Sequence, residues 1–314
     1  MRDVVKVVVG AAIAVLLFVW VFHGVGRDAL LEALRSATVG GLVLSAALQY
    51  GHNVFRVARW RLLLAPVRPG VPFRPMITAV TLGYLVTWTI PGRLGELVRP
   101  ALLSSREDLP LGPCMGTGVV DRILDGIASL MLCAVGVLVT RWQGEAAAYA
   151  GAIRAGSVTT VGVLLVVLAV LVGLSLRAAA LETRLAGRRG LIAWTVRTIV
   201  SLARGTEALR NPVRLAAILF HSLAAWATVG LGMWVGLRAC GIDIPFAGAF
   251  VMQPMLAIGV AVPTPGGAGG FHAAAKAALI YLFLVPETLA VSASILLHLA
   301  GVVPVFVVGA VLLW

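Results

Sequence analysis

The sequence contains few charged residues and almost no lysine. Charged side chains make up 12% of the 314 residues, and lysine occurs only at Lys6 and Lys276. Hydrophobic residues make up 60%, and the mean hydropathy is +1.01. This composition excludes a water-soluble globule. The connectors between the apolar runs are roughly ten to forty residues long, too short for a soluble domain of about 100 residues, so any chemistry must lie in or beside a membrane.

Sequence motifs for ATP hydrolysis, metal binding and nucleophilic catalysis are also missing. The chain has no G-x-x-x-x-G-K-[ST], H-E-x-x-H, G-x-S-x-G or Cys-x-x-Cys pattern. We therefore expect no cofactor, no metal and no ATPase activity, and transport would have to follow a gradient. Cys114, Cys133 and Cys240 show no ligand spacing, which predicts small buried hydrophobes.

The positive charge is concentrated in short loops. The net charge is +12, and nearly all of the basic residues are arginines that lie between apolar runs. This distribution favours anionic lipid headgroups as partners, and nucleic acid is not expected. At the N-terminus, Arg2 and Lys6 precede an apolar run that ends near Phe22 without an Ala-x-Ala-like cleavage site, which predicts an uncleaved first helix.

Hydropathy predicts an all-α, polytopic membrane protein. Two apolar regions, 76–103 and 246–284, are interrupted at their centres by 91–96 and 263–270, which are rich in Pro and Gly. Each predicts two half-helices forming a re-entrant hairpin, although an ordinary kinked span or two short spans would give the same pattern. About six full transmembrane helices are predicted from the uninterrupted windows at 4–22, 39–55, 118–140, 158–176, 215–237 and 288–314.

The loop charges predict the orientation of these spans. With both termini in the cytoplasm, cytoplasmic segments hold fifteen basic residues and outside loops hold five. The first hairpin then enters from the cytoplasm and the second from outside, as an inverted repeat of two halves at about 1–140 and 157–314 within a single domain, 1–314. The predicted location is a bacterial-type cytoplasmic membrane.

The first interruption carries charged residues. Arg93, Glu96 and Arg99 follow one another at i, i+3 and i+6, nearly along one helical face. Charges at this depth are costly unless they are paired or hydrated. They predict a cavity in which the arginines bind a headgroup phosphate while Glu96 balances or exchanges charge. An interfacial ion pair without a ligand remains an alternative.

The second interruption offers backbone N–H groups in place of side chains. A glycine-rich turn that leads into a helix can bind an anion, although close helix packing explains the same glycines. His272 and Lys276, at i and i+4 on the following helix, are expected to face the same cavity, whereas His221 and His298 are expected to be hydrogen-bonded core residues. The glycines assigned to this half of the site are Gly266, Gly267, Gly269 and Gly270.

Further charged residues lie on two neighbouring predicted helices. Asp121, Arg122 and Asp125 are expected to open a helix, where they form either a proton or cation relay or a set of N-terminal acids paired with an arginine. On the second predicted helix, a polar stripe is expected to face protein and not lipid; its members are Gln49, His52, Asn53, Arg56 and Arg59. Arg56 and Arg59 are expected to extend toward cytoplasmic phosphates, and the run from Arg59 to Leu64 is expected to form an interfacial anchor.

Taken together, these motifs resemble the lysylphosphatidylglycerol synthase transmembrane family, the flippase-like domain of bacterial multiple peptide resistance factors. The resemblance covers nearly the whole chain. It rests on Arg59-Trp60, Asp121-Arg122 with Asp125, and the stretches 91–99 and 263–269, of which Pro-x-Arg-x-Gly-Glu-x-x-Arg is the most specific. It implies movement of a lipid, often aminoacylated or sugar-linked, through a site built from two re-entrant hairpins.

Two departures limit what the resemblance implies. Many relatives have a glutamate where this chain has His272, so the charge of that half-site would differ. The chain ends at Trp314 without the soluble transferase domain, so we do not expect it to synthesise lysylphosphatidylglycerol.

Three functions therefore stand as hypotheses. The first is a non-enzymatic lipid or lipid-linked-glycan flippase. The second is a membrane glycosyl- or phosphotransferase that acts on a polyprenyl-phosphate-linked substrate, with Glu96, Asp121 or Asp125 as base. The third is an accessory subunit without turnover. The expected partners are membrane lipids or lipid-linked saccharides, together with a second copy of the chain or a partner synthase or glycosyltransferase.

Overall fold

The computed structural model describes residues 26–89, 94–142, 146–177, 191–262 and 264–314, and every element in these ranges is helical. The long helices are α3 (Val39–Leu64), α6 (Leu111–Val139), α7 (Ala146–Leu176), α10 (Pro212–Ala239) and α13 (Glu287–Leu313). The shorter elements are α2 (Arg27–Ser36), α4 (Phe73–Thr89), α5 (Gly95–Arg106), α9 (Leu191–Ala203), η1 (Arg204–Arg210), α11 (Phe246–Ala261), η2 (Pro265–Gly267) and α12 (Ala268–Phe283).

Helix length and composition identify a multi-pass membrane protein. Within the described residues, α6, α7, α10 and α13 are each long and apolar enough to cross a bilayer. Helix α3 meets the same test only together with α2, to which it is joined at a bend of 78°. The predicted first span at 4–22 lies outside the described residues. The structure therefore has four clear spans and a fifth that is bent, and the predicted total of six is not established.

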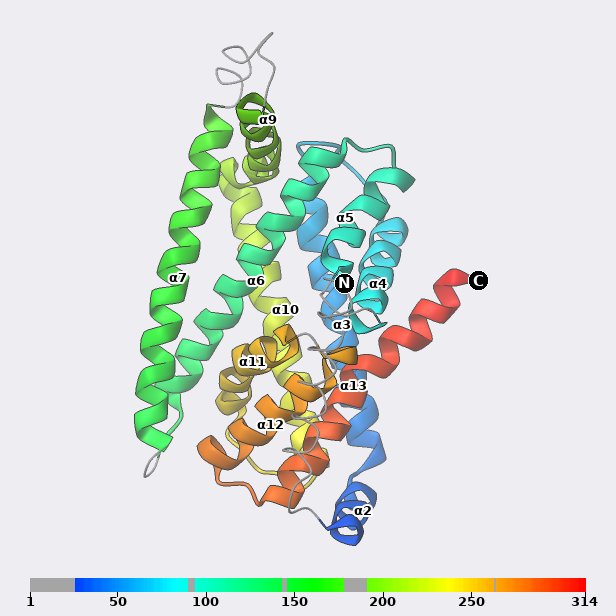
Figure 1. The fold of residues 1–314 in the computed structure, drawn as a ribbon, viewed down its shortest axis with the longest axis vertical. Coiled ribbons are helices and arrows are strands. Elements are labelled where there is room, and N and C mark those ends of the chain that lie inside the picture. The colour runs from blue at the N-terminus through cyan, green and yellow to red at the C-terminus, as the bar shows by residue number, and fades with distance from the viewer. Residues whose placement is uncertain (1–25, 90–93, 143–145, 178–190, 263) are drawn as a thin grey trace.

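Each interrupted region folds as two short helices joined by a break. Helices α4 and α5 have 17 and 12 residues, and α11 and α12 have 16 each. At about 1.5 Å per residue each is at most about 26 Å long, less than the roughly 30 Å of hydrocarbon in a bilayer. The α4–α5 pair lies toward one end of the molecule and the α11–α12 pair toward the other (Figure 1).

Both helix pairs are held together by facing glycines. A Cβ on Gly95 would lie 1.8 Å from the Gly83 carbonyl oxygen, and a Cβ on Gly270 would lie 1.9 Å from the Gly259 carbonyl oxygen. No other residue fits at either contact, because real Cβ atoms do not approach so closely. The same packing device therefore closes both helix pairs.

The turn before α12 meets the end of α4. Gly266 and Gly267 have positive φ values of 61° and 63°, a left-handed conformation that glycine adopts without strain. A Cβ on Gly267 would lie 3.3 Å from the Trp88 ring, and one on Gly266 would lie 3.6 Å from the Trp88 carbonyl oxygen. The turn before α12 therefore packs on the last turn of α4.

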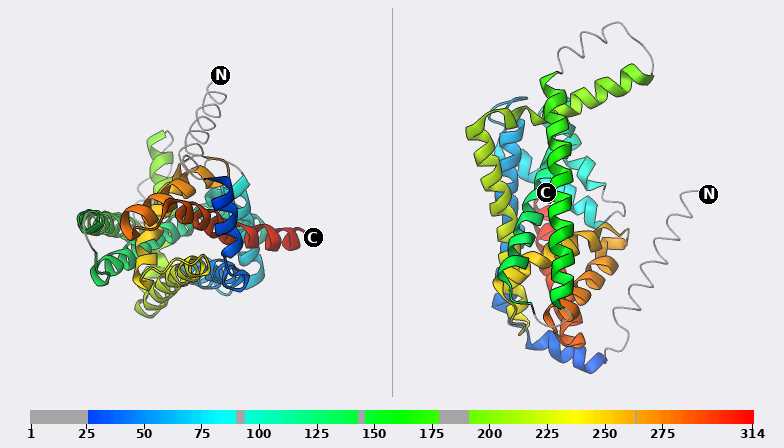
Figure 2. Two further views of the ribbon diagram at one scale, coloured as in Figure 1. Left: turned by 90° about the horizontal axis from the view of Figure 1, so that it is seen from below. Right: turned by 90° about the vertical axis from the view of Figure 1, so that its left-hand side faces the viewer.

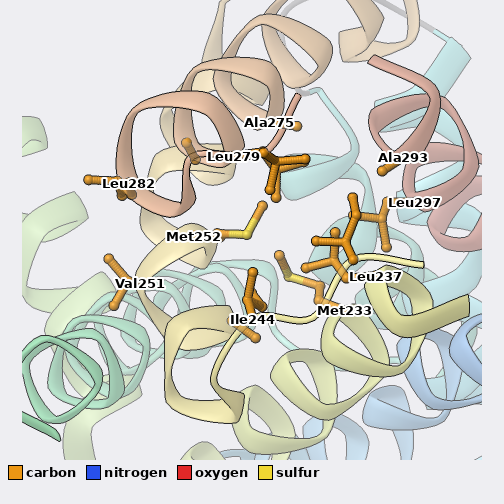
Figure 3. Packing of buried hydrophobic residues seen from close by; sticks show 14 of the residues in the cluster. Met233, Leu237, Ile244, Val251, Met252, Ala275, Leu279, Leu282, Ala293 and Leu297 are labelled. Carbon is orange, nitrogen blue, oxygen red and sulfur yellow. The ribbon is translucent and has the colours of Figure 1, made fainter. Parts of the chain in front are cut away.

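An apolar core anchors the second helix pair. Figure 3 shows Met252 of α11 between Leu279 of α12 and Met233 and Leu237 of α10, with Leu297 of α13 beside them. These helices bury their apolar side chains against one another, whereas α7 runs along the edge of the molecule (Figure 2) and buries only 6% of its apolar window. The exposed apolar face of α7 is suited to contact with lipid.

Candidate functional site

A cluster of charged side chains joins α3, α5 and α6 in the interior. We call it the arginine–aspartate cluster; its members are Arg56, Arg59, Glu96, Arg99, Asp121, Arg122 and Asp125. Four arginines and three carboxylates leave one formal positive charge in excess. Buried charges are tolerated only when they are paired and hydrogen-bonded, so the cluster depends on all of its contacts.

Asp121 is at the centre of the cluster and is fully buried. Its Oδ1 lies 2.6 Å from Arg59 Nη2, and its Oδ2 lies 2.7 Å from Arg99 Nη1 and 3.3 Å from Arg56 Nη2. Arg99 also stacks over the Trp60 ring, 4.7 Å from its centroid. Three arginines from two helices therefore converge on one carboxylate.

Asp125 lies one turn further along α6 and faces the same arginines. Its Oδ2 lies 2.5 Å from Arg56 Nη2, and its Oδ1 lies 2.7 Å from Arg59 Nη2. The indole nitrogen of Trp226 donates to the same Oδ1 at 3.1 Å, which connects α10 to the cluster. The sequence spacing explains why these four residues meet. The two aspartates are at i and i+4 on α6 and the two arginines are at i and i+3 on α3, so each pair lies on one face of its helix.

Glu96 and Arg122 form the outer edge of the cluster. The Arg122 Nε pairs with Glu96 Oε2, and its Nη1 lies 3.3 Å from Asp125 Oδ2. Both residues are partly exposed, at 33% for the Arg122 side chain and 25% for that of Glu96. This ion pair ties α5 of the first helix pair to α6.

Three sequence predictions about these residues are wrong. Arg59 and Trp60 do not form an interfacial anchor, and Arg56 and Arg59 do not extend to the surface, because Arg59 and Trp60 are fully buried and Arg56 is 4% exposed. Asp121 does not open a helix either, since α6 begins ten residues earlier at Leu111. In each case, pairing with buried partners outweighs the preference of a charge for the interface.

A cavity of about 210 Å³ lies beside the cluster. At about 30 Å³ per water molecule it has room for about seven waters or a small polar group. Its polar wall comes from α3, α4 and α6. The residues of that wall are Gln49, His52, Arg56, Tyr84, Arg122 and Asp125.

The rest of the cavity lining is mostly apolar and comes chiefly from the second half of the chain. Leu256 and Val260 of α11, Phe271 of α12 and Leu297 of α13 contribute to it, and Trp88 of α4 completes it. Both helix pairs thus reach one cavity whose lining combines charged and apolar side chains, as a site for an amphiphile requires.

The predicted residues of the first break are only partly placed. Arg93 lies outside the described residues. Arg99 is 3% exposed and is directed at Asp121, whereas Glu96 contacts the cavity-lining Arg122. The first break therefore contributes to the cavity through the Glu96–Arg122 pair.

At the second break, the glycines shape the turn and the packing. Gly266 and Gly267 form the turn against Trp88, and Gly270 packs against Gly259, which is the close-packing interpretation of this motif. Gly269 lies in the first turn of α12.

Neither cationic side chain predicted on α12 lines this cavity. His272 bonds to Ser294 at 3.1 Å and to His298 at 3.3 Å. Lys276 is buried, and its Nζ lies 2.6 Å from Glu287 Oε1. The prediction that both face the same cavity is therefore wrong, because each finds a partner on α13.

Sequence reasoning missed two further residues of the site. Tyr84 receives a hydrogen bond from Arg56, and Trp226 binds Asp125. Both carry a polar group on an apolar helix, and such groups find a partner when buried. That signal marks the residues but does not reveal the partner. The three cysteines are buried free thiols, as predicted.

Comparison with known proteins agrees with this architecture. Residues 7–309 match the family described as the lysylphosphatidylglycerol synthase TM region. A UPF0104 membrane protein of Methanocaldococcus jannaschii is 27% identical over 103 residues, which are 32% of this chain and 31% of that protein. The chain thus matches about a third of the length of this curated relative. Since the family match spans nearly all of its residues, the chain belongs to the lysylphosphatidylglycerol synthase transmembrane-region family.

Proposed function

We propose that this protein is a lipid translocator that moves an anionic or lipid-linked headgroup between the leaflets of the cytoplasmic membrane by alternating access. The observation that carries the proposal is the cavity that both helix pairs reach, whose lining combines charged and apolar side chains. A headgroup phosphate needs cationic donors away from lipid, while the attached chains favour apolar surroundings. The family membership supports a role in the membrane.

Arg56 and Arg122 are the cluster arginines that line the cavity, and we assign them to the headgroup phosphate. The excess positive charge of the arginine–aspartate cluster favours an anion there. Glu96 holds Arg122 in place, and Arg99 together with Arg59 fixes Asp121 behind the cavity wall. Arg93, which follows α4 in the chain, would add a further cation near the first break.

Alternating access would use the two helix pairs as gates. The matching contacts Gly83–Gly95 and Gly259–Gly270, and the three spans α6, α7 and α10 between the pairs, support an inverted repeat. The excess of arginine in the segments assigned to the cytoplasm supports cytoplasmic termini. The lipid would come from a synthase or glycosyltransferase, which makes such an enzyme a candidate partner.

The transferase hypothesis receives less support. A general base needs a carboxylate that can accept a proton from the substrate. Asp121 and Asp125 are each bound by two or more arginines, and Glu96 is paired with Arg122. These contacts occupy the carboxylates as structural acceptors.

Reconstitution tests the translocator proposal. Purified protein in phosphatidylglycerol-containing liposomes, with an acyl-labelled phosphatidylglycerol probe, should make inner-leaflet label accessible to an added membrane-impermeant reductant. R122Q should slow this by about tenfold or more, since a charge-assisted hydrogen bond contributes about 1.5–3 kcal/mol. R238Q is the matched control, because Arg238 is exposed and its partners, Asp243 and the Trp234 ring, do not belong to the arginine–aspartate cluster.

The competing outcomes are distinct. Equal rates for wild type and R122Q, with both proteins folded, would contradict the assignment of Arg122. A covalently altered lipid in the product mixture would favour a transferase. Activity that requires a co-purifying protein would favour the accessory-subunit hypothesis.

A further inference from the structure

Two histidines meet next to the contact between the helix pairs. The His298 Nδ1 of α13 lies 3.3 Å from the His272 Nε2 of α12. The His298 ring stacks on Phe271 with centroids 4.8 Å apart and lies 5.4 Å from the Trp88 ring. Phe271 and Trp88 line the cavity, so one layer of aromatic rings separates the histidine pair from it.

The surrounding hydrogen bonds favour one assignment of the protons to the ring nitrogens. The Ser294 hydroxyl donates to the Val291 carbonyl at 2.7 Å, so its oxygen acts as acceptor toward His272 Nδ1 at 3.1 Å. His272 therefore carries its proton on Nδ1 and accepts at Nε2. It follows that His298 carries its proton on Nδ1 and donates it to His272.

This assignment leaves one nitrogen lone pair open. The His298 Nε2 is buried and has no hydrogen-bond partner among the described residues. The backbone of Gly266, in the turn that packs on Trp88, is the backbone group that interacts with the His298 ring. Buried polar atoms are nearly always paired, so an unpaired acceptor requires an explanation.

The charges around the pair are few. On α12, one turn beyond His272, Lys276 is paired with Glu287 at 2.6 Å. The described part of α4 carries only Arg74, in its first turn, far in sequence from Trp88, and α13 carries only Glu287. On α3, the cavity-lining titratable residues are His52 and Arg56, and Arg56 is bound to the aspartates. A proton on the pair would therefore not be offset by an adjacent carboxylate.

We propose that His298 Nε2 is the proton-binding site of this protein, and that proton uptake there strengthens the contact between the Gly266–Gly267 turn and Trp88. The proton comes from water and forms an N–H bond on His298. The resulting imidazolium donates to the backbone of Gly266, keeps its Nδ1–H bond to His272, and is attracted to the faces of Phe271 and Trp88. Loss of the proton removes these attractions and frees the turn.

This site would make transport proton-dependent, and that part of the inference rests on the proposed function. The proton occupancy of a single site changes from about 90% to about 10% over two pH units. A transport rate that is proportional to the protonated or to the deprotonated fraction therefore changes by up to about ninefold. The turn touches both helix pairs, so its release is a step that alternating access requires.

Tryptophan fluorescence in nanodiscs tests the site without transport. A protonated imidazole quenches a neighbouring indole, so acidification from about pH 8 to about pH 4, the range of perturbed histidines, should quench Trp88 in the wild type. W88F and H298Q should both lose this component. H221Q should retain it, because among the described residues the His221 ring contacts the rings of Phe55 and Phe220 and not a tryptophan.

S294A provides a second variant that changes little volume. Loss of the Ser294 acceptor weakens His272 as acceptor for His298, so the quenching midpoint should move to lower pH. A titration that is identical in wild type, H298Q and W88F would overturn the proposal, as would a midpoint unmoved in S294A.

Transport measurements in the same liposomes distinguish the proton site from the translocator function. Wild-type rates should change with pH across the quenching midpoint, and those of H298Q should not. Quenching without any lipid transport would refute the translocator and leave the proton site intact. Transport with no dependence on His298 would refute the coupling alone.

Discussion

The indole nitrogen of Trp226 lies 3.1 Å from Asp125 Oδ1, and this bond links α10 to the arginine–aspartate cluster, beside the bond that Arg59 donates to Ser222 Oγ at 3.1 Å. The Trp226 donor is neutral and the Asp125 acceptor is charged. The bond therefore stabilises the carboxylate together with the arginines, without adding to the excess positive charge of the cluster. Trp226 also lines the cavity, which places a structural bond directly in its wall.

W226F should therefore destabilise the protein more than a comparable change elsewhere. Hydrogen bonds to charged groups contribute about 1.5–3 kcal/mol, against about 0.5–1.5 kcal/mol for neutral pairs. W142F is the matched comparison, because Trp142 Nε1 donates to the neutral Val137 carbonyl at 2.8 Å. Thermal unfolding in detergent should give the larger loss for W226F, and the reverse order would contradict the role of the Asp125 bond.

R59M should be among the most damaging single substitutions. It leaves Asp121 and Asp125 short of a buried partner, and removing one side of a buried pair costs about 3–5 kcal/mol. Arg61 lies two residues away on the same helix and is exposed, so R61M should change stability by less than about 0.5 kcal/mol. Yield and unfolding temperature measure the difference, and equal effects would contradict the pairing.

G95A and G270A should each disturb one helix pair. The added Cβ would lie under 2 Å from a backbone oxygen, so the helices must separate, at a cost of about 1–3 kcal/mol. G51A is the control, since no atom lies within 4 Å of a Cβ built there. Unfolding temperatures measure the effect, and a neutral G95A would show that α4 and α5 are not packed as described.

Exchanging the charges of Glu96 and Arg122 tests the tie between α5 and α6. E96R and R122E should each lower stability and transport, because each places like charges together. The double variant E96R/R122E should recover part of the stability, which a double-mutant cycle measures. It should not recover transport if Arg122 itself binds the headgroup. A coupling energy of zero in the cycle would contradict the presence of this ion pair.

Cysteine labelling tests the orientation. The native thiols are buried, so an exposed engineered cysteine should dominate labelling by a membrane-impermeant maleimide. D243C should react from outside intact cells, and R68C should react only after the membrane is opened, since both positions are exposed. The opposite pattern would invert the topology, and the hairpins would then enter from the other sides.

The helical nature of the chain and the two interruptions were predictable because hydropathy and Gly/Pro content depend on local sequence. The pairing of charges was not. Asp121 and Arg59 are 62 positions apart, and no local pattern indicates that they meet. Arg59 was interpreted as an interfacial anchor because a sequence shows the charge of a side chain but not its partner. Lys276 was predicted to face the cavity for the same reason, although it forms an ion pair with Glu287.

The partnership between α3 and α6 also constrains how the chain enters the bilayer. Helix α3 carries Arg56 and Arg59, whose partners are synthesised only when α6 emerges about sixty residues later. Until then these guanidinium groups have no counter-charge and cannot settle stably in hydrocarbon. We therefore expect α3 to reach its final position in the bilayer only together with α6.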